Sequence, residues 1–123
     1  MNKILFDSDV IINILKKKNE TLMKLDTLLD NKLFISPITI AEIYAGVKPK
    51  EIESVEQLFS YFEIINIDKE IAKIAGNYAN RYKKAFNGIS LEDYLIAATA
   101  KKYNIKLWTY NKKHYPMDDI KII

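Results

Sequence analysis

Residues 4–12, Ile4-Leu5-Phe6-Asp7-Ser8-Asp9-Val10-Ile11-Ile12, decide the fold. A short apolar run ends in three polar residues, and a second apolar run begins at once. A β-branched and aromatic run of this kind is typical of a buried strand, and the polar break before a new apolar stretch indicates a strand-to-helix turn. In open α/β sheets, ligands bind beyond the carboxyl ends of the strands. The sequence therefore predicts carboxylates at the edge of a sheet where ligands bind.

The two aspartates of this turn have different interpretations. Asp9 has the chemistry to cap the following helix by accepting a backbone N–H, or it adds charge to a site. Asp7 is harder to explain as purely structural, because a charge at the end of an apolar strand needs a partner or a cation.

The composition predicts one globular domain over residues 1–123. Of the 123 residues, 49% are hydrophobic and 28% are charged, which is typical of a chain with a substantial core. Cysteine is absent, so disulfides and thiolate metal sites are excluded. No apolar run approaches the length that spans a bilayer, and the N-terminus does not resemble a signal peptide. We expect a cytoplasmic protein with no membrane partner.

Apolar periodicity predicts strands that alternate with helices along the whole chain. The expected strands are 4–6, 33–35, 64–67 and 106–109, with a possible fifth at the edge over 120–123; the expected helices are 10–18, 20–29, 38–47, 52–62, 69–86 (stopped by Asn87-Gly88) and 90–103. Such alternation indicates a parallel sheet covered on both faces. The predicted fold is therefore α/β, a three-layer α/β/α sandwich with a central parallel sheet of four to five strands.

Three acids share one expected placement. Asp7 follows the first strand, Glu42 lies in the helix after the second, and Asp93 lies at the start of the helix before the fourth. Elements at the carboxyl ends of the strands converge, so we expect the three to meet. An alternative is purely structural, because Thr39–Glu42 and Ser90–Asp93 both resemble capping boxes.

A cation would offset the repulsion within such a cluster, because gathered carboxylates raise each other's pKa. Oxygen ligands without cysteine favour Mg²⁺, or Mn²⁺ as a substitute. Such an ion supports hydrolysis of a phosphodiester. The predicted chemistry is metal-dependent phosphodiester hydrolysis.

Lysine occurs in blocks, while the formal net charge is only +3. The blocks are Lys16–Lys18, Lys83-Lys84, Lys101-Lys102 and Lys112-Lys113. They are compatible with solvated faces or with a polyanionic partner such as RNA.

Four segments in order resemble the motifs of PIN-domain ribonucleases, in particular the VapC-type toxins of toxin–antitoxin pairs. They are ILFDSDVIINIL, SPITIAEIYAGV, ISLEDYLIAATAKKYNIKLWTYN and the terminal HYPMDDIKII. The resemblance covers essentially the whole chain. It implies an α/β/α sandwich, Mg²⁺-dependent endonuclease action on RNA, a homodimer, and inhibition by a VapB-like antitoxin whose tail enters the active site.

The resemblance also assigns site residues by position. The metal-binding and catalytic acids fall on Asp7, Glu42 and Asp93, with Ser8 in the small hydroxyl position, and the fourth catalytic position falls on Asn111. Glu92 is the neighbour of the third acid, not its match. Asn111 is a neutral amide, which puts a second tightly held metal in doubt.

Two further residues have open interpretations. His114 stands where some relatives have an acid, and it either contacts phosphate or is a bystander. Arg81 is a candidate phosphate contact or a member of a surface pair.

Two other functions compete with the ribonuclease. Asp7-Ser8-Asp9 after a strand is also similar to haloacid-dehalogenase-type phosphatases, but a convincing downstream lysine and paired acids are missing. The second alternative is a catalytically silent PIN module that binds RNA or protein, for which the neutral Asn111 is the only hint.

Overall fold

Four parallel strands form the centre of the protein, which a computed structural model describes over residues 2–85 and 88–123. The strands are β1 (Lys3–Phe6), β2 (Lys32–Ile35), β3 (Glu63–Ile64) and β4 (Lys106–Trp108), in the order β3-β2-β1-β4. The connecting helices are α1 (Ser8–Leu15), α2 (Asn19–Leu28), α3 (Pro37–Gly46), α4 (Ile52–Phe59), α5 (Lys69–Tyr82) and α6 (Leu91–Tyr103), with short 3-10 turns at Pro49–Glu51 and Lys112–His114. The predicted α/β fold is confirmed.

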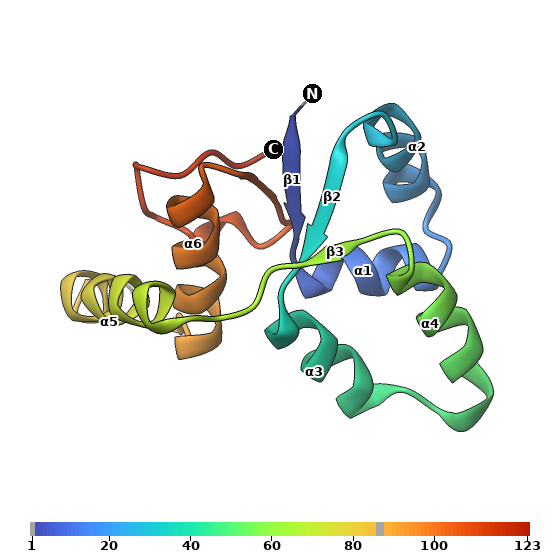
Figure 1. The fold of residues 1–123 in the computed structure, drawn as a ribbon, viewed down its shortest axis with the longest axis horizontal. Coiled ribbons are helices and arrows are strands. Elements are labelled where there is room, and N and C mark those ends of the chain that lie inside the picture. The colour runs from blue at the N-terminus through green and yellow to red at the C-terminus, as the bar shows by residue number, and fades with distance from the viewer. Residues whose placement is uncertain (1, 86–87) are drawn as a thin grey trace.

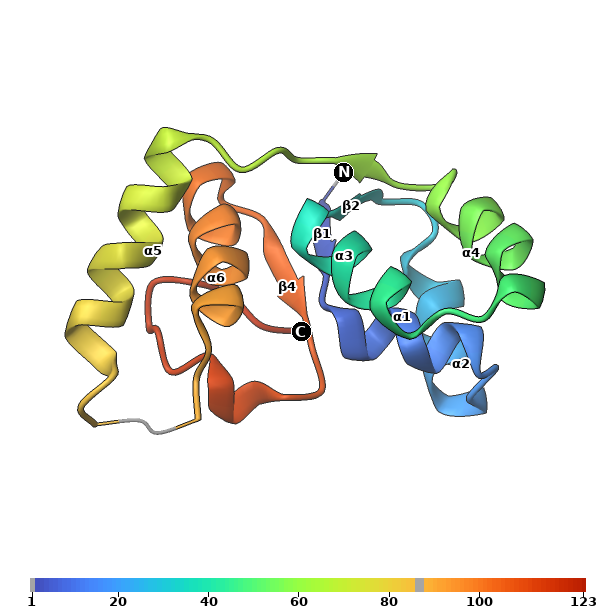
Figure 2. The ribbon, with the colours of Figure 1, turned by 90° about the horizontal axis from the view of Figure 1, so that it is seen from below.

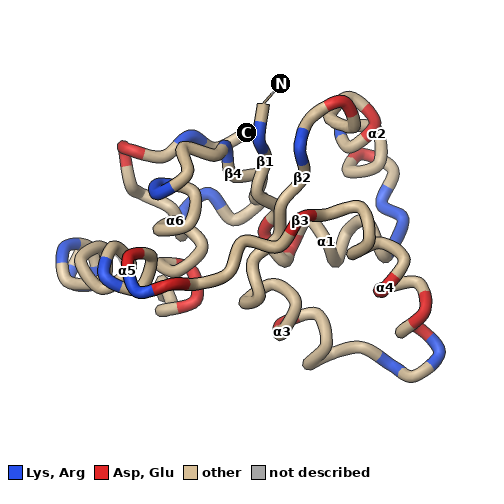
Figure 3. Tube along the Cα trace, viewed as in Figure 1, with Lys and Arg blue, Asp and Glu red and all other residues tan. Residues whose placement is uncertain are grey.

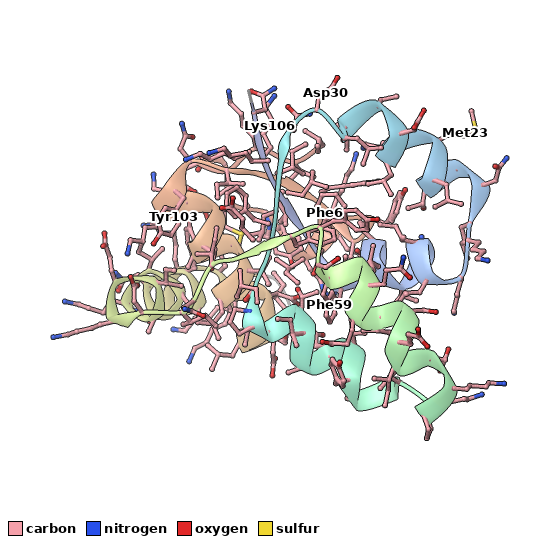
Figure 4. The ribbon with its side chains drawn as sticks, turned by 45° about the vertical axis from the view of Figure 1, so that its right-hand side comes forward. Phe6, Met23, Asp30, Phe59, Tyr103 and Lys106 are labelled. Carbon is pink, nitrogen blue, oxygen red and sulfur yellow. The ribbon has the colours of Figure 1, made fainter. Side chains whose placement is uncertain are left out.

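Helices cover both faces of this sheet (Figures 1 and 2). Ile4 and Phe6 of β1 point into a core shared with α1, α3 and α4, whereas Leu5 points into a core shared with α5 and α6. This alternation is the period of two that a pleated strand imposes. Figure 4 shows Phe6 among the side chains between the sheet and α4. The three layers follow from strands that are apolar on both sides.

Several predicted boundaries are wrong. The third strand is Glu63–Ile64, not 64–67, because after Ile65 N donates to Ile35 O (3.1 Å) the chain leaves the sheet toward α5. The C-terminal segment forms only an isolated bridge, Leu107 with Ile122, instead of a full fifth strand. Helix α5 ends at Tyr82, and the predicted stop falls partly on residues outside the described ranges; Gly88 itself has a φ of 87°, as a left-handed stop requires.

Capping side chains mark the starts of α3 and α5. Ser36 caps α3 by accepting from Ile38 N (3.1 Å), and Asp68 caps α5 by accepting from Ile71 N (2.9 Å). Pro37 stands in the first turn of α3, where its fixed φ suits a helix. Helices α1 and α3 thus begin directly at the carboxyl ends of β1 and β2.

None of the helices within residues 2–85 and 88–123 combines the length and apolar character that a bilayer crossing requires.

Candidate active site at the carboxyl end of the sheet

Asp7 is the buried centre of the site, with 7% of its surface exposed. It caps α1: Oδ1 accepts from Ser8 N (2.9 Å), and Oδ2 accepts from Thr109 Oγ1 (2.8 Å) and Tyr115 OH (3.0 Å). All three donors are neutral. The described ion pairs include none with Asp7. Neutral hydrogen-bond donors of the protein therefore replace water around the carboxylate, while no described ion pair neutralises its negative charge.

Tyr115 connects Asp7 to Asp93. Its hydroxyl lies 3.4 Å from Asp93 Oδ1 in addition to its bond with Asp7. Burial, followed by the charges of Asp7 and Asp93, raises the pKa of the Tyr115 phenol, so it stays protonated. A single hydroxyl thus holds two carboxylates that are 86 residues apart in the sequence.

Glu42 is joined to the same cluster through Ser8. Ser8 Oγ donates to Glu42 Oε1 (2.8 Å) and lies 3.5 Å from Asp7 Oδ1. Partial burial of its carboxylate raises the pKa of Glu42; the bond from Ser8 opposes this, and the charges of Asp7, Asp93 and Glu92 add to it. Ser8 thus connects Glu42 to Asp7, and Tyr115 connects Asp93 to Asp7, so hydroxyl groups lie between the acids.

The two expected capping boxes have different outcomes. Ser90 and Asp93 form one, with Asp93 N to Ser90 Oγ at 3.2 Å and Ser90 N to Asp93 Oδ2 at 3.1 Å. Thr39 and Glu42 do not, because Ser36 is the cap of α3 and both residues lie inside that helix. Asp93 therefore has a structural role as well as a place in the site, while Glu42 is free of a capping role.

Asp9 does not cap α1, because Asp7 does. Its Oδ2 accepts from Tyr110 N (3.0 Å), whereas Oδ1 is a buried oxygen with no hydrogen-bond partner among the described residues. Burial and then the charge of Asp7 raise the pKa of Asp9. Asp9 thus adds charge next to Asp7.

His114 lies beside Asp93, and Asn111 lies beside His114, while a role of His114 toward phosphate stays a prediction. His114 Nδ1 is 3.0 Å from Asp93 Oδ2 and 2.8 Å from the Asn111 side-chain nitrogen. One ring nitrogen cannot donate to Asp93 and accept from Asn111 at once. A hydrogen on Nδ1 satisfies the carboxylate, and a half-turn of the amide then presents the Asn111 oxygen to the ring.

Arg81 lies outside this cluster in the described contacts. It is exposed in the last turn of α5, with its guanidinium 5.8 Å from the centre of the Tyr82 ring. Its role toward phosphate stays a prediction.

The donor set suits a magnesium ion, although the acids are not closed around a point. Within the described ranges no three His, Asp or Glu side chains are arranged to hold a metal ion. Mg²⁺ uses one or two carboxylates and completes its shell with water or phosphate oxygens. Asp7 and Asp93 offer two such carboxylates, and the unpartnered Asp9 Oδ1 marks a deficit of positive charge or donors nearby. Asp7 and Asp93 are therefore the residues that would hold such an ion, and Glu42 is joined to Asp7 through Ser8.

A groove of about 470 Å³ begins at Glu42 and runs between α1, α3 and α4. Its apolar lining is Ile12, Leu15, Ile43, Val47 and Val55, and Lys16 and Lys50 line it as well. We refer to these residues as the α1–α3–α4 groove. It offers an extended partner an apolar surface that leads to the acids.

Sequence reasoning missed Thr109 and Tyr115, both of which bond to Asp7. Thr109 follows β4 directly, so the rule that places Asp7 at the carboxyl end of β1 could have found it. Tyr115 had no such signal, because it follows a 3-10 turn whose direction the sequence does not indicate.

Comparisons with known proteins agree with this geometry. The PIN domain family model matches residues 4–120. Ribonuclease VapC10 of Mycobacterium tuberculosis is 37% identical over 118 residues, covering 93% of this chain and 86% of the relative. A toxin-antitoxin complex from Klebsiella pneumoniae superposes with a TM-score of 0.83 at 27% identity, covering 98% of this chain and 95% of the other. VapBC2 from Rickettsia felis, bound to a promoter DNA fragment, has a TM-score of 0.85 at 23% identity, covering 98% and 97%. This chain therefore belongs to the PIN domain family.

Proposed function

We propose that this protein is a Mg²⁺-dependent endoribonuclease and the toxin of a toxin–antitoxin pair. The observation that carries the proposal is the junction of Asp7, Glu42 and Asp93 through the hydroxyls of Ser8 and Tyr115. The ribonuclease name of relatives at 33–37% identity supports RNA as the substrate.

Each residue of the cluster has a separate role in this proposal. Asp7 and Asp93 hold the cation, and Asn111 and His114 keep the Asp93 carboxylate in place. Glu42, whose pKa is raised mainly by burial, takes up the proton of the attacking water more readily than an exposed glutamate. Ser8 fixes the direction of Glu42. The bound ion would supply positive charge that stabilises the phosphate as it is attacked.

The test is cleavage of RNA by the purified protein with Mg²⁺ and with EDTA. We expect Asp93→Asn to abolish cleavage, because it removes a cation ligand. Glu92→Gln is the matched control: it removes an exposed charge from the same helical turn and should retain activity. Equal cleavage by the parent and Asp93→Asn would contradict the proposal.

Two outcomes would favour the competing functions. An aspartyl-phosphate or fluoroberyllate adduct on Asp7 would support a haloacid-dehalogenase-type phosphatase. This is not expected, since the convincing downstream lysine and paired acids of that class are missing from the sequence. RNA binding without cleavage at any Mg²⁺ or Mn²⁺ concentration would support a catalytically silent module.

We infer that the partner is a VapB-like antitoxin that lies in the α1–α3–α4 groove. Complexes titled as VapBC or toxin-antitoxin share the fold of this chain, and the groove is continuous with Glu42. The gene beside this one should encode the partner. Ile12→Glu should weaken its binding at least tenfold, because 39% of this apolar side chain is exposed to the groove. Met23→Glu, on exposed α2, is the control.

A homodimer, a single domain over residues 1–123 and a cytoplasmic location complete the proposal. Light scattering of the purified protein measures the first of these directly.

A further inference from the structure

A polar pocket of about 140 Å³ lies at the amino ends of the strands, at the opposite end of the sheet from Asp7. Its lining is Asn2, Lys3, Asn104, Ile105, Lys106 and Lys121. Three of these six residues are lysines, and none is acidic. Figure 3 shows the separation of charge, with basic segments on the strands near both termini and acidic segments at the ends of β1 and the start of α6.

The backbone that carries the lysines is held firmly. Ile4 pairs with Lys106 in the register of β1 and β4, so Lys3 lies one position before that pair on the adjacent strand. Lys121 joins them because Leu107 N donates to Lys121 O (2.8 Å). Asn104 ends α6 in the left-handed conformation, with a φ of 53°. The positions of the three charges are therefore set by the sheet.

These three lysines take part in none of the ion pairs between the described residues. Those ion pairs use Lys101, Lys102 and His114. Lys106 is also half-buried, so its ammonium has less freedom to move away. A bound anion would relieve the mutual repulsion of three neighbouring ammonium groups.

We propose that this pocket binds a phosphate group. Three ammonium groups supply charge, and the Asn2 and Asn104 amides supply neutral donors to further phosphate oxygens. The pocket volume of about 140 Å³ is large enough for one phosphate group. The proposal does not depend on the ribonuclease assignment, because no residue of the acidic cluster lines this pocket.

A titration with inorganic phosphate, followed by amide NMR at constant ionic strength, tests the proposal. We expect saturable shifts at the backbone amides of Asn104, Lys106 and Lys121. Lys106→Gln combined with Lys121→Gln should weaken binding at least about tenfold, since charged hydrogen bonds are lost. Lys69→Gln combined with Lys73→Gln removes the same charge from exposed positions on α5 and should bind as the parent does.

Lys121→Gln alone gives a milder variant, and the dispersion of its spectrum reports that it folds. Unsaturable shifts in the parent, shifts located elsewhere, or equal affinities for the two double variants would overturn the proposal.

A second arm identifies the source of the phosphate. A short single-stranded RNA is added in EDTA to the phosphate-saturated protein. Displacement of phosphate from the Lys106 and Lys121 amides would make the ligand an RNA phosphodiester, held far from the scissile bond. Retention of phosphate would make the ligand a free phosphate.

Discussion

Each end of the parallel sheet gathers side chains of one charge, but the two ends differ in how far those charges are buried. At the carboxyl end, Asp7 is buried and accepts three hydrogen bonds from neutral donors. At the amino end, Lys3 and Lys121 are exposed, and water can reach them. Buried like charges need donors that the fold itself supplies, whereas exposed ones are screened by solvent and salt. The carboxylate at the acidic end is thus fixed in place by the fold, whereas the lysine side chains are not.

The largest expected effect is the loss of activity on neutralising the buried acid. Asp7→Asn should lower the rate of RNA cleavage by about 100- to 1,000-fold, because it removes charge that holds the cation in a water-poor site. Thr109 and Tyr115 can still donate to the amide oxygen, which keeps two of the three bonds, while the bond from Ser8 N is lost. Asp26→Asn, which changes an exposed acid on α2, is the control. Full activity in Asp7→Asn would mean that RNA cleavage does not need the buried carboxylate at the acidic end.

The next effect concerns the donor between the acids. Tyr115→Phe should lower the free energy of unfolding of the metal-free protein by about 1.5–3 kcal/mol, the usual value of a hydrogen bond to a charged group. Urea unfolding in EDTA measures this change. Tyr110→Phe removes a hydroxyl that bonds only to Thr21, so it should cost less. A smaller loss in Tyr115→Phe than in the control would mean that the acids do not depend on this donor.

Tyr115 also marks the limit of what the sequence predicts. Asp7 and Glu42 were predictable because they follow the carboxyl ends of β1 and β2, and Asp93 because it starts the helix that precedes β4. Tyr115 and the separation of the acids by hydroxyls depend on the path of an irregular loop, which no periodicity encodes. The same holds for β3, whose length is set by where the chain turns toward α5 and not by its apolar run of residues 64–67.

Substitution of Asp9 should stabilise the fold, unlike that of Tyr115, because the charge of Asp9 is not fully compensated. Its pKa lies above the ordinary value of 3.8, through burial and then the charge of Asp7, so the folded state binds this proton more tightly than the unfolded chain. Its contribution to stability therefore falls as the pH rises from 3.8 to the raised pKa. In EDTA, Asp9→Asn should be more stable than the parent at pH 7, by about 1 kcal/mol or less, with no gain at pH 3.

Thermal melts from pH 3 to 7 would measure this gain. Asn can still accept from Tyr110 N, so the backbone contact is kept. If Asp9→Asn is less stable than the parent at pH 7, the fold stabilises the Asp9 carboxylate more than the unpartnered Oδ1 indicates.

The smallest expected effect is the change in stability on neutralising a lysine at the amino end of the sheet. Lys106→Gln relieves repulsion with Lys3 and Lys121, so it should raise the free energy of unfolding at low salt, by about 0.3 kcal/mol. Because these charges are largely solvated, 0.5 M salt should remove the gain, while the gain of Asp9→Asn should survive, since salt screens buried charges far less. Lys73→Gln, on exposed α5, controls for the loss of one positive charge. Equal salt sensitivity of the stability gains in Lys106→Gln and Asp9→Asn would mean that the charges at the two ends do not differ in burial. The acids would then be no more fixed in place than the lysines.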